Sequence, residues 1–567
     1  MAQAEAQLLA PGSPFEMECV DVLGIPARLF KGRAPDLTAI LRASAAFGDA
    51  EYLVYNDGET ELRLSFKEHA ARVAATAMAL RSRYNVGPGD RVAVLASNRP
   101  EWIVTFWATV SLGAVAVGLN AWWTADEIAY AIADCEPKLI VADSKRAQRM
   151  VSVETNVPML VMERDFESVW LDPGASHLAT PDLDLDVDLD LDEDAPAIIL
   201  YTSGTTGRPK GVVHSHRNLC AMIGVSFFHG ARMMMTNPAQ PMADGSPAHS
   251  NCVLVTSPLF HVSGLHCAAI TCLASGTKSV WLGGRFDAER ALAMIQNERV
   301  TGWGYTATIL HRLLNHPRVG DYDLSSLRII GGGGSVIPSG LQDRARELIP
   351  SVRPTLSVGY GLTEGCAFTC LNPGAELSAY PESCGRPVPL VDIEIRGTDG
   401  APLAHGEEGD IFCRGPLVML EYWRNPEATA EAIHPGRWLK TGDVGRFDGT
   451  RLWLASRKRD MIIRGGENVY PAEIEQRLLA HPDVAEAAII GVDHEELGQE
   501  VKAVVVPVVG AALAPDQLSA WVGKTLAYYK VPAHWQFQTE ALPRNATGKV
   551  LKRVLSDGER STFIEET

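Results

Sequence analysis

The sequence predicts an α/β protein with a large N-terminal part, a small β subdomain and a separate α+β unit towards the C-terminus. Buried strand-like runs alternate with helical segments between residues 91 and 144, and a second α/β run covers about 252–365. Short strands with turn residues occupy about 385–455, and an α+β pattern follows beyond 460. With 567 residues the chain is too long for one hydrophobic core, so two or more domains are expected.

The first run reads as β-α-β-α-β. Thr124 and Glu127 form a capping box, which predicts a helix over 125–134, and Pro100 can open the helix before it. Apolar runs without alternation are typical of central parallel strands. Such strands are expected at 91–97, 114–120 and 138–144.

The apolar stretch from Trp102 to Trp123 carries no charged residue and is long enough to cross a bilayer. Glycines at 113 and 118 interrupt it, and both flanks fit the alternating pattern. We therefore expect a buried helix followed by a central strand, with no transmembrane segment. A membrane span is the alternative for this stretch.

Two segments are interpreted as connections. The run DLDLDVDLDLDED at 182–194 would repel itself as a strand edge, so a solvated connector into a buried strand at 197–200 is expected. A cation site is the alternative there, although the spacing is not that of a calcium loop. Residues 229–251 have no periodicity and predict a long mobile loop.

The later elements are predicted from turns and prolines. RFDGTRLWLAS at 446–456 contains a D-G hairpin, which places antiparallel strands in the β subdomain. Pro471 opens a helix over 471–482. A second C-terminal helix is expected at 518–530.

Charge and cysteine content exclude several function classes. The formal net charge is −18, which argues against a nucleic-acid-binding protein, because such a protein carries a basic face. An acidic protein with an anionic substrate must instead gather a few cations or a metal at its site. The ten cysteines include no C-x-x-C pair, so free thiols in the cytoplasm are expected, and the N-terminus does not read as a signal peptide.

YTSGTTGRPKG at 201–211 has the glycines, hydroxyls and lysine of a phosphate-binding loop, directly after an apolar run. It is not a Walker loop, because Pro209 precedes Lys210 and Gly211 follows it. The loop therefore predicts phosphate binding, but not of the kind found in Walker-type nucleotide-binding proteins.

Five motifs, in this order, resemble those of the adenylate-forming superfamily, which includes acyl-CoA synthetases, coumarate–CoA ligases, luciferases and peptide-synthetase adenylation domains. They are YTSGTTGRPKGV (201–212), GYGLTE (359–364), WLKTGDVG (438–445), SRKRDMIIRGGENVYPAEIE (456–475) and PRNATGK (543–549). The resemblance covers roughly residues 50–555. It implies a large N-terminal domain of stacked doubly wound sheets at 1–457, including the β subdomain at about 385–455, and a small mobile domain at 458–567.

The resemblance to the acyl-CoA ligase branch implies a two-step reaction. A substrate carboxylate attacks the α-phosphate of ATP, giving acyl-AMP and pyrophosphate, and the CoA thiol then gives acyl-CoA and AMP. The implied substrates are a small-molecule carboxylic acid, ATP and CoA, with Mg²⁺ as the metal. Catalysis of such phosphoryl chemistry rests on positioning and on cationic and N–H groups.

The resemblance also implies the nucleotide-binding residues. Lys210 would steady the phosphate loop or the pyrophosphate, and Glu364 would hold Mg²⁺ with Thr205 or Thr206 nearby. Tyr360 would stack on adenine, Asp443 would accept the ribose hydroxyls, and Arg457 would bind ribose from across the domain junction. The remaining nucleotide-site residues are Ser203, Gly204, Gly207, Gly333, Gly334, Ser335, Gly361 and Thr363.

In the C-terminal part, Lys549 would contact the α-phosphate and the carboxylate in the adenylation transition state. Arg459 occupies the hinge position, where relatives commonly carry Asp or Lys. Rotation about it would remove Lys549 and bring Gly465 and Gly466 to the site, leaving a passage for a pantetheine arm.

His261 matches a pocket histidine of the CoA-ligase branch, and a packed core histidine is the alternative. By analogy the acyl pocket is lined by Ser263, Cys267, Trp303, Thr306–Thr308 and Gly331–Gly334. His214 and His216 are expected to be structural. Fatty, aromatic and sterol-derived acids all stay open as substrates.

Three other functions stay open. An acyl-AMP ligase would pass the acyl group to a carrier protein or an amine, although RGGEN at 464–468 resembles the CoA branch. A non-catalytic nucleotide-binding or scaffold protein would not depend on Lys549. Luciferase-like oxidation is the third. A homodimer is compatible with the sequence.

Overall fold

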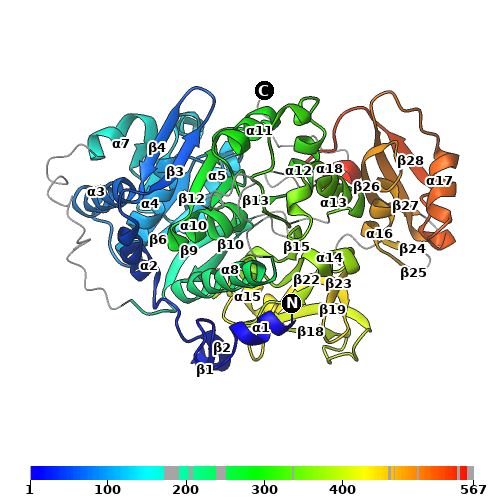
Figure 1. Ribbon diagram of the computed structural model, residues 1–567, viewed down its shortest axis with the longest axis horizontal. Helices are drawn as coiled ribbons and strands as arrows, with labels where there is room; N and C mark the ends of the chain where they lie inside the picture. Colours follow the sequence, from blue (N-terminus) through cyan, green and yellow to red (C-terminus); the bar gives the residue numbers. More distant parts are fainter. Residues whose placement is uncertain are drawn as a thin grey trace.

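The computed structural model describes residues 2–170, 191–202, 209–237, 251–334, 337–457, 462–464, 467–494, 497–545 and 550–557. Within them the chain forms two large sheets, a small antiparallel sheet and a C-terminal sheet. In Figure 1 the large sheets are blue to green, the small sheet is yellow, and the C-terminal unit is orange at one end of the molecule. The predicted α/β class is confirmed.

The first large sheet has seven strands in the order β20-β10-β9-β6-β5-β7-β8. From β9 to β8 all neighbours are parallel, while β10 pairs antiparallel with β9 and β20. The strands are β5 (Arg91–Leu95), β6 (Val115–Leu119), β7 (Leu139–Ala142), β8 (Met159–Val161), β9 (Pro196–Thr202), β10 (Lys210–Ser215) and β20 (Glu421–Tyr422). The β-α-β-α-β pattern predicted for 91–144 is thus confirmed.

The apolar stretch that raised the membrane alternative is divided between helix α4 (Pro100–Ser111) and strand β6. Every residue of both elements is buried inside the protein, so the membrane interpretation of this stretch is wrong. The next helix, α5 (Ala125–Cys135), begins at the predicted capping box of Thr124 and Glu127.

One described helix, α8 (His216–Thr236), is long and apolar enough to cross a membrane by length and composition alone. Half of its apolar window is buried in the protein, as in the core helix of a folded domain. This helix also corrects the predicted loop at 229–251, because residues 229–236 continue the helix. Residues 238–250 lie outside the described part of the chain.

The second large sheet has nine strands in the order β17-β16-β15-β14-β13-β11-β12-β3-β4. The strands from β15 to β3 are parallel. They are β3 (Glu51–Asn56), β4 (Glu61–Ser65), β11 (Cys252–Val255), β12 (Lys278–Leu282), β13 (Gly302–Tyr305), β14 (Ile329–Gly332), β15 (Ser357–Tyr360), β16 (Cys370–Pro373) and β17 (Arg386–Pro387). The carboxyl ends of β13, β14 and β15 therefore meet at one edge, where α/β sheets place their ligands.

Helices cover both large sheets, and one hydrophobic cluster contains residues from each, for example Val94 of β5 and Trp281 of β12. The other helices of this part are α2 (Leu37–Ser44), α3 (Phe66–Tyr84), α6 (Ser144–Arg149), α7 (Met162–Trp170), α10 (Thr271–Ser275), α11 (Ala288–Asn297), α12 (Ala307–Leu314), α13 (Ser339–Leu348) and α14 (Gly374–Ala379). Near the N-terminus, α1 (Ala2–Leu8) contacts α8, and β1 (Met17–Val22) and β2 (Ile25–Phe30) form a hairpin.

The small sheet contains β18 (Asp392–Arg396), β19 (Glu408–Arg414), β21 (Ile433–His434), β22 (Trp438–Phe447) and β23 (Leu452–Arg457), with α15 (Pro426–Ala432) before β21. The predicted hairpin joins β22 to β23 through Gly449, whose φ of 90° suits glycine.

The C-terminal sheet contains β24 (Ile462–Arg464), β25 (Glu467–Val469), β26 (Val484–His494), β27 (Gly498–Pro507) and β28 (His534–Phe537), with α16 (Pro471–Leu479), α17 (Pro515–Gly523) and α18 (Lys552–Asp557). Helix α17 begins and ends earlier than the predicted 518–530, and a 3₁₀ turn at Tyr528–Lys530 follows it.

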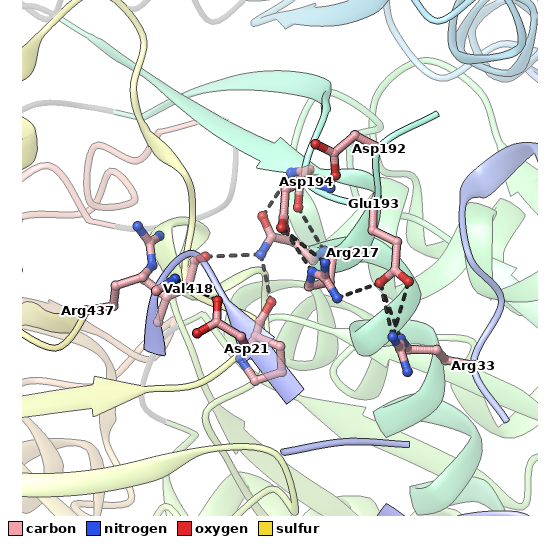
Figure 2. Close-up of polar contacts among 12 residues, drawn as sticks. Asp21, Arg33, Asp192, Glu193, Asp194, Arg217, Val418 and Arg437 are labelled. Carbon is pink, nitrogen blue, oxygen red and sulfur yellow. Dashed lines mark hydrogen bonds and ion pairs between the residues drawn. The ribbon is translucent and has the colours of Figure 1, made fainter. Parts of the chain in front are cut away.

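The described end of the acidic run is held by arginines. Figure 2 shows Glu193 between Arg33 and Arg217, with nitrogen–oxygen distances of 3.1 and 2.5 Å. Arg217 also bonds Asp194 at 2.8 Å, directly before β9. These two acids therefore anchor the connector to α8, and their oxygens are occupied by guanidinium groups rather than offered to a cation.

Candidate active site

A cleft of about 3500 Å³ runs between the large part of the chain and the C-terminal unit. Small-molecule pockets usually hold roughly 300–1,000 Å³, so this cleft can accept more than one substrate. Every predicted site residue whose side chain or glycine backbone is described lines it: Lys210, His261, Ser263, Cys267, Trp303, Thr306, Ala307, Thr308, Gly331, Gly332, Gly333, Gly334, Tyr360, Gly361, Thr363, Glu364 and Asp443.

The other predicted site residues lie outside the described part of the chain. They are Ser203, Gly204, Thr205, Thr206, Gly207, Ser335, Arg459, Gly465, Gly466 and Lys549. Arg457 is described by its backbone, which pairs with Asp443 across β22 and β23. The two residues predicted to bind ribose are therefore direct neighbours in the small sheet.

Glycines let the backbone of the strand ends approach closely. A Cβ atom at Gly361 would lie 1.4 Å from the carbonyl oxygen of Ala367, which no side chain tolerates. At Gly333 a Cβ atom would lie 3.2 Å from the carbonyl oxygen of Gly359. These contacts explain why glycines stand at this edge of the sheet, and they leave backbone polar groups on the cleft wall.

Tyr360 and Asp443 connect the large sheet to the small sheet. The Tyr360 hydroxyl donates a hydrogen bond of 2.8 Å to Oδ2 of Asp443. Burial, followed by the nearby Asp443 charge, raises the pKa of Tyr360 well above its usual value, so the hydroxyl remains a donor. The backbone N–H of Asp443 also donates to Oγ1 of Thr441 at 3.2 Å. This carboxylate is therefore held in one orientation at the cleft wall.

Glu364 lies in a 3₁₀ turn, η7 (Thr363–Gly365), that follows β15. Its Oε1 accepts a hydrogen bond of 2.8 Å from the hydroxyl of Tyr422. The Lys210 ammonium lies 4.9 Å from the centre of the Tyr422 ring, within cation–π range. Tyr422 thus links the lysine that ends the phosphate loop to the carboxylate of the next motif.

His261 is the N-cap residue of the short helix α9 (Val262–Gly264). Its Nδ1 is 2.9 Å from Oγ of Ser263 and accepts a 3.4 Å hydrogen bond from the Ser263 N–H. The ring lines the cleft and is partly exposed, which favours the pocket interpretation over a packed core histidine.

The segment after His261 adopts an uncommon backbone. Residues 265–270 form a π-helical turn, and such turns occur often at functional sites. Cys267 lies in this turn and lines the cleft. Burial raises the pKa of its thiol to about 12, so Cys267 serves as an apolar wall rather than as a nucleophile.

Trp303 supplies an aromatic wall from β13. Its indole N–H donates to Oγ1 of Thr256 at 3.1 Å, which fixes the ring. The next residue, Gly304, also lines the cleft, and a Cβ atom there would meet nothing within 4 Å. Because consecutive strand residues face opposite sides of a sheet, this open space lies on the face of β13 opposite the nearly buried Trp303 ring.

His214 and His216 are buried, in agreement with their predicted structural role. The Nε2–H group of His214 donates to the carbonyl oxygen of Thr363 at 2.7 Å, and the backbone N–H of Leu37 donates to Nδ1 of His216 at 3.3 Å. Burial lowers the pKa of each histidine to about 4.

Two contacting residues were missed at the sequence level. Tyr422 bonds Glu364, and Thr441 bonds the backbone of Asp443. Thr441 belongs to the quoted motif WLKTGDVG, so its position could have been noticed. Tyr422 reaches the site because β20 pairs with β10, a long-range contact that no local pattern indicates.

The comparisons with known proteins agree with this geometry. The family model for AMP-binding enzyme matches residues 40–423, and that for the AMP-binding enzyme C-terminal domain matches 473–549. Feruloyl-CoA synthase of Amycolatopsis sp is 35% identical over 86% of this chain and 92% of its own length. Indoleacetate–CoA ligase of Aromatoleum aromaticum is 33% identical over 90% of this chain and 97% of its own.

A solved structure shares the fold over most of this chain. The o-succinylbenzoate CoA synthetase MenE of Bacillus subtilis, solved with its acyl-adenylate intermediate OSB-AMP, superposes with a TM-score of 0.73 at 28% identity. The superposition covers 92% of this chain and 98% of that one. The similarity therefore extends over both the large part and the C-terminal unit.

Proposed function

The chain belongs to the AMP-binding enzyme family and is an AMP-forming carboxylic acid–CoA ligase, and we propose that the residues lining the cleft bind ATP at one end and a ring-bearing acid at the other. The observation that supports this assignment is the convergence of Tyr360, Asp443, Glu364 and His261 on one cleft. These side chains suit the recognition of adenine, ribose, a metal–phosphate group and an acyl carboxylate, respectively.

At the nucleotide end, Asp443 accepts ribose hydroxyls through its carboxylate, which Tyr360 holds by a hydrogen bond. Its fixed orientation supports this role, because a preorganised carboxylate loses little freedom when ATP binds. The backbone of Arg457 pairs with that of Asp443 in the sheet, which supports Arg457 as the second residue proposed to bind ribose. Lys210 and the loop at 203–207 hold the pyrophosphate end of ATP.

The donor set at Glu364 fits Mg²⁺. Magnesium takes one or two carboxylates and fills its other positions with phosphate oxygens and water. Glu364 offers one partly exposed carboxylate at the cleft, and Tyr422 orients it through Oε1. When bound, the ion would neutralise negative charge on the phosphates. We propose Thr205 or Thr206 as its second protein contact.

The domain boundary lies between 457 and 458 in this proposal. Strand β23 ends at Arg457 and β24 begins at Ile462, so a very short connection joins the small sheet to the C-terminal sheet. Hinges need only a few residues that absorb a backbone change. Arg459 is the proposed hinge, Lys549 the proposed catalytic cation of the first half-reaction, and Gly465 and Gly466 the proposed passage for CoA.

A ring-bearing acid fits the acyl end. Gly304 leaves open width on one face of β13, Cys267 adds an apolar wall, and the fixed Trp303 ring supports the strand from its other face. A flat ring buries apolar surface in an open space of this kind. Two relatives are named for ring-bearing acids, ferulate and indoleacetate. His261 orients the carboxylate at the inner end.

Two further proposals concern the state of the protein. All ten cysteines are unpaired, which supports a reducing compartment such as the cytoplasm. We also propose a homodimer, and sedimentation at several concentrations would test it.

A panel of acids tests the proposed function. Pyrophosphate release is measured with ATP, with or without CoA, for cinnamates, indoleacetate, sterol-derived acids and long-chain fatty acids. We expect the highest kcat/KM for acids with one or two rings and an acyl-CoA product that requires CoA. Preference for a long-chain acid would overturn the ring-bearing class. An adenylate that passes to an added amine faster than to CoA would favour the alternative acceptor.

A further inference from the structure

A buried cluster next to η7, the turn that carries Glu364, contains His214, His266 and Cys366. They come from three separate elements: β10, the π-helical turn at 265–270, and the residue that follows η7. One potential metal-ligand atom from each residue lies within 4.8 Å of those of the other two. Two imidazoles and a thiol are the side chains that bind zinc and similar metals.

The two histidines have ring nitrogens that the fold leaves unpaired. Nδ1 of His214 and Nε2 of His266 are buried without a hydrogen-bond partner among the described residues. A buried polar atom without a partner is unfavourable. The cost is removed at His214 if its nitrogen binds a metal.

The contacts already present resemble those of a metal centre. Sγ of Cys366 lies 3.5 Å from Nδ1 of His266. Zinc bonds of about 2.3 Å to sulfur and about 2.05 Å to nitrogen, at a tetrahedral angle, place these two atoms about 3.5 Å apart. His214 donates its other ring N–H to the carbonyl oxygen of Thr363, as metal-binding histidines do to fix the ring.

The backbone around the cluster is strained. Cys366 has a φ of 53° and Ala367 a φ of 96°, and residues other than glycine rarely adopt such positive φ angles. Such residues are unfavourable and accumulate at functional sites. The thiol of Cys366, one of the two, is the group that contacts His266.

We propose that His214, His266 and Cys366 bind one zinc ion. The ion would connect η7, which carries Glu364, to β10 and to the π-helical turn at 265–270. In the binding step, Zn²⁺ displaces the thiol proton, the S–H bond breaks, an S–Zn bond forms, and the proton leaves to solvent. Both imidazoles bind in their neutral form through a lone pair.

The competing explanation needs no metal. The Cys366 thiol would donate to Nδ1 of His266 or to the carbonyl oxygen of Asn218, which lies 3.6 Å from Sγ. In that case the trio is a packed polar cluster that merely supports η7. The two explanations differ in whether purified protein holds a metal.

Metal content of the full chain separates them. Protein is purified without an affinity tag that binds metals, its zinc is counted by mass spectrometry, and metal-free protein is titrated with Zn²⁺ and Co²⁺. We expect one equivalent of zinc and, with Co²⁺, a thiolate charge-transfer band with tetrahedral visible bands. Protein without bound zinc and without a thiolate–cobalt spectrum would overturn the proposal.

Single variants locate the ion. Cys366→Ser should abolish the charge-transfer band, and His266→Gln should weaken zinc binding roughly 100-fold or more, because loss of a ligand exceeds the effect of an outer-shell change. His69→Gln and Cys272→Ser are matched controls: both residues are buried, and neither belongs to such a cluster in the described residues. Unchanged zinc content in Cys366→Ser, or equal losses in the controls, would contradict the assignment. If a variant fails to fold, the cobalt spectrum of the unaltered chain still decides.

Discussion

The hydroxyl of Tyr360, at the end of β15, donates a 2.8 Å hydrogen bond to Asp443 on β22. One bond thus joins the residue proposed to stack on adenine to the residue proposed to bind ribose. Asp443 in turn pairs with Arg457. These contacts therefore connect β15 of the large sheet, through β22, to β23, the last strand before the proposed hinge. Nucleotide binding and domain position can therefore influence each other through three residues.

Removal of the Asp443 carboxylate should weaken ATP binding. A hydrogen bond to a charged group contributes about 1.5–3 kcal/mol, so Asp443→Ala should raise the KM for ATP about 10- to 100-fold. Tyr360→Phe keeps the ring and loses only the orienting bond, so its effect on the same KM should be smaller. Steady-state pyrophosphate release at varied ATP measures both. A larger effect of Tyr360→Phe than of Asp443→Ala would contradict the ribose assignment.

The bond from Tyr422 to Glu364 predicts an effect on magnesium. Tyr422→Phe should raise the Mg²⁺ concentration for half-maximal adenylation roughly tenfold, as expected for loss of an outer-shell partner. The KM for the acid should change little. Tyr528→Phe is the control, because Tyr528 is highly exposed. A normal magnesium curve for Tyr422→Phe would show that this bond does not orient the metal ligand.

The two half-reactions should separate by mutation. Lys549→Ala removes the proposed transition-state cation and should slow acyl-AMP formation by about 10²-fold or more, while thioester formation from supplied acyl-AMP survives. Arg459→Pro should restrict rotation and slow the second step, leaving adenylation largely intact. Single-turnover assays of each step measure these rates. Equal loss of both steps in Arg459→Pro would refute the hinge assignment.

Acid should destabilise the fold through buried histidines. Burial and the nearby Arg72 lower the pKa of His69 from 6.5 to about 3, so the folded state keeps this ring neutral. The unfolded state takes up a proton below about pH 6.5, and stability therefore falls as the pH drops from 6.5 towards 3. His69→Phe should reduce the slope of unfolding free energy against pH by about 1 kcal/mol per pH unit near pH 5. Denaturant unfolding at several pH values measures it, and an unchanged slope would show that His69 is protonated in the folded state.

Local patterns predicted most of the fold. Apolar runs and a capping box were sufficient for β5 to β7 and α5, because these elements are set by neighbours in the sequence. The error at 229–236 has a physical cause. These residues, with their methionines, continue helix α8. The polar and proline-rich residues after Thr236 hide the helical period in the sequence, so the whole stretch was interpreted as a loop. Similarly, the end of α17 is set by packing in the C-terminal unit rather than by composition.

The site was predicted where it rests on motifs and missed where it rests on pairing. Tyr360, Glu364 and Asp443 stand in short motifs and were all placed on one cleft. Tyr422 enters through the β10–β20 pairing, and the cluster of His214 with Cys366 forms across more than 150 residues of chain. Side chains that meet only after folding leave no spacing for the sequence to show.

The width of the acyl end should depend on Gly304. A Cβ atom there meets nothing within 4 Å, so a larger side chain enters the cleft rather than the protein core. Gly304→Leu should therefore fold normally and fill the open space on this face of β13. For acids with two fused rings, kcat/KM should fall about 10- to 200-fold, the range expected when a pocket loses room for one or two groups.

The same substitution should spare small acids and ATP. The KM for ATP should remain unchanged, because Tyr360 and Asp443 lie at the nucleotide end. Gly320→Leu is the matched control: a Cβ atom at Gly320 also meets nothing within 4 Å, yet this residue does not line the cleft. A kcat/KM profile across the acid panel distinguishes the outcomes. Equal losses for small and fused-ring acids would mean that Gly304 matters for the backbone of β13 and not for the shape of the acyl pocket.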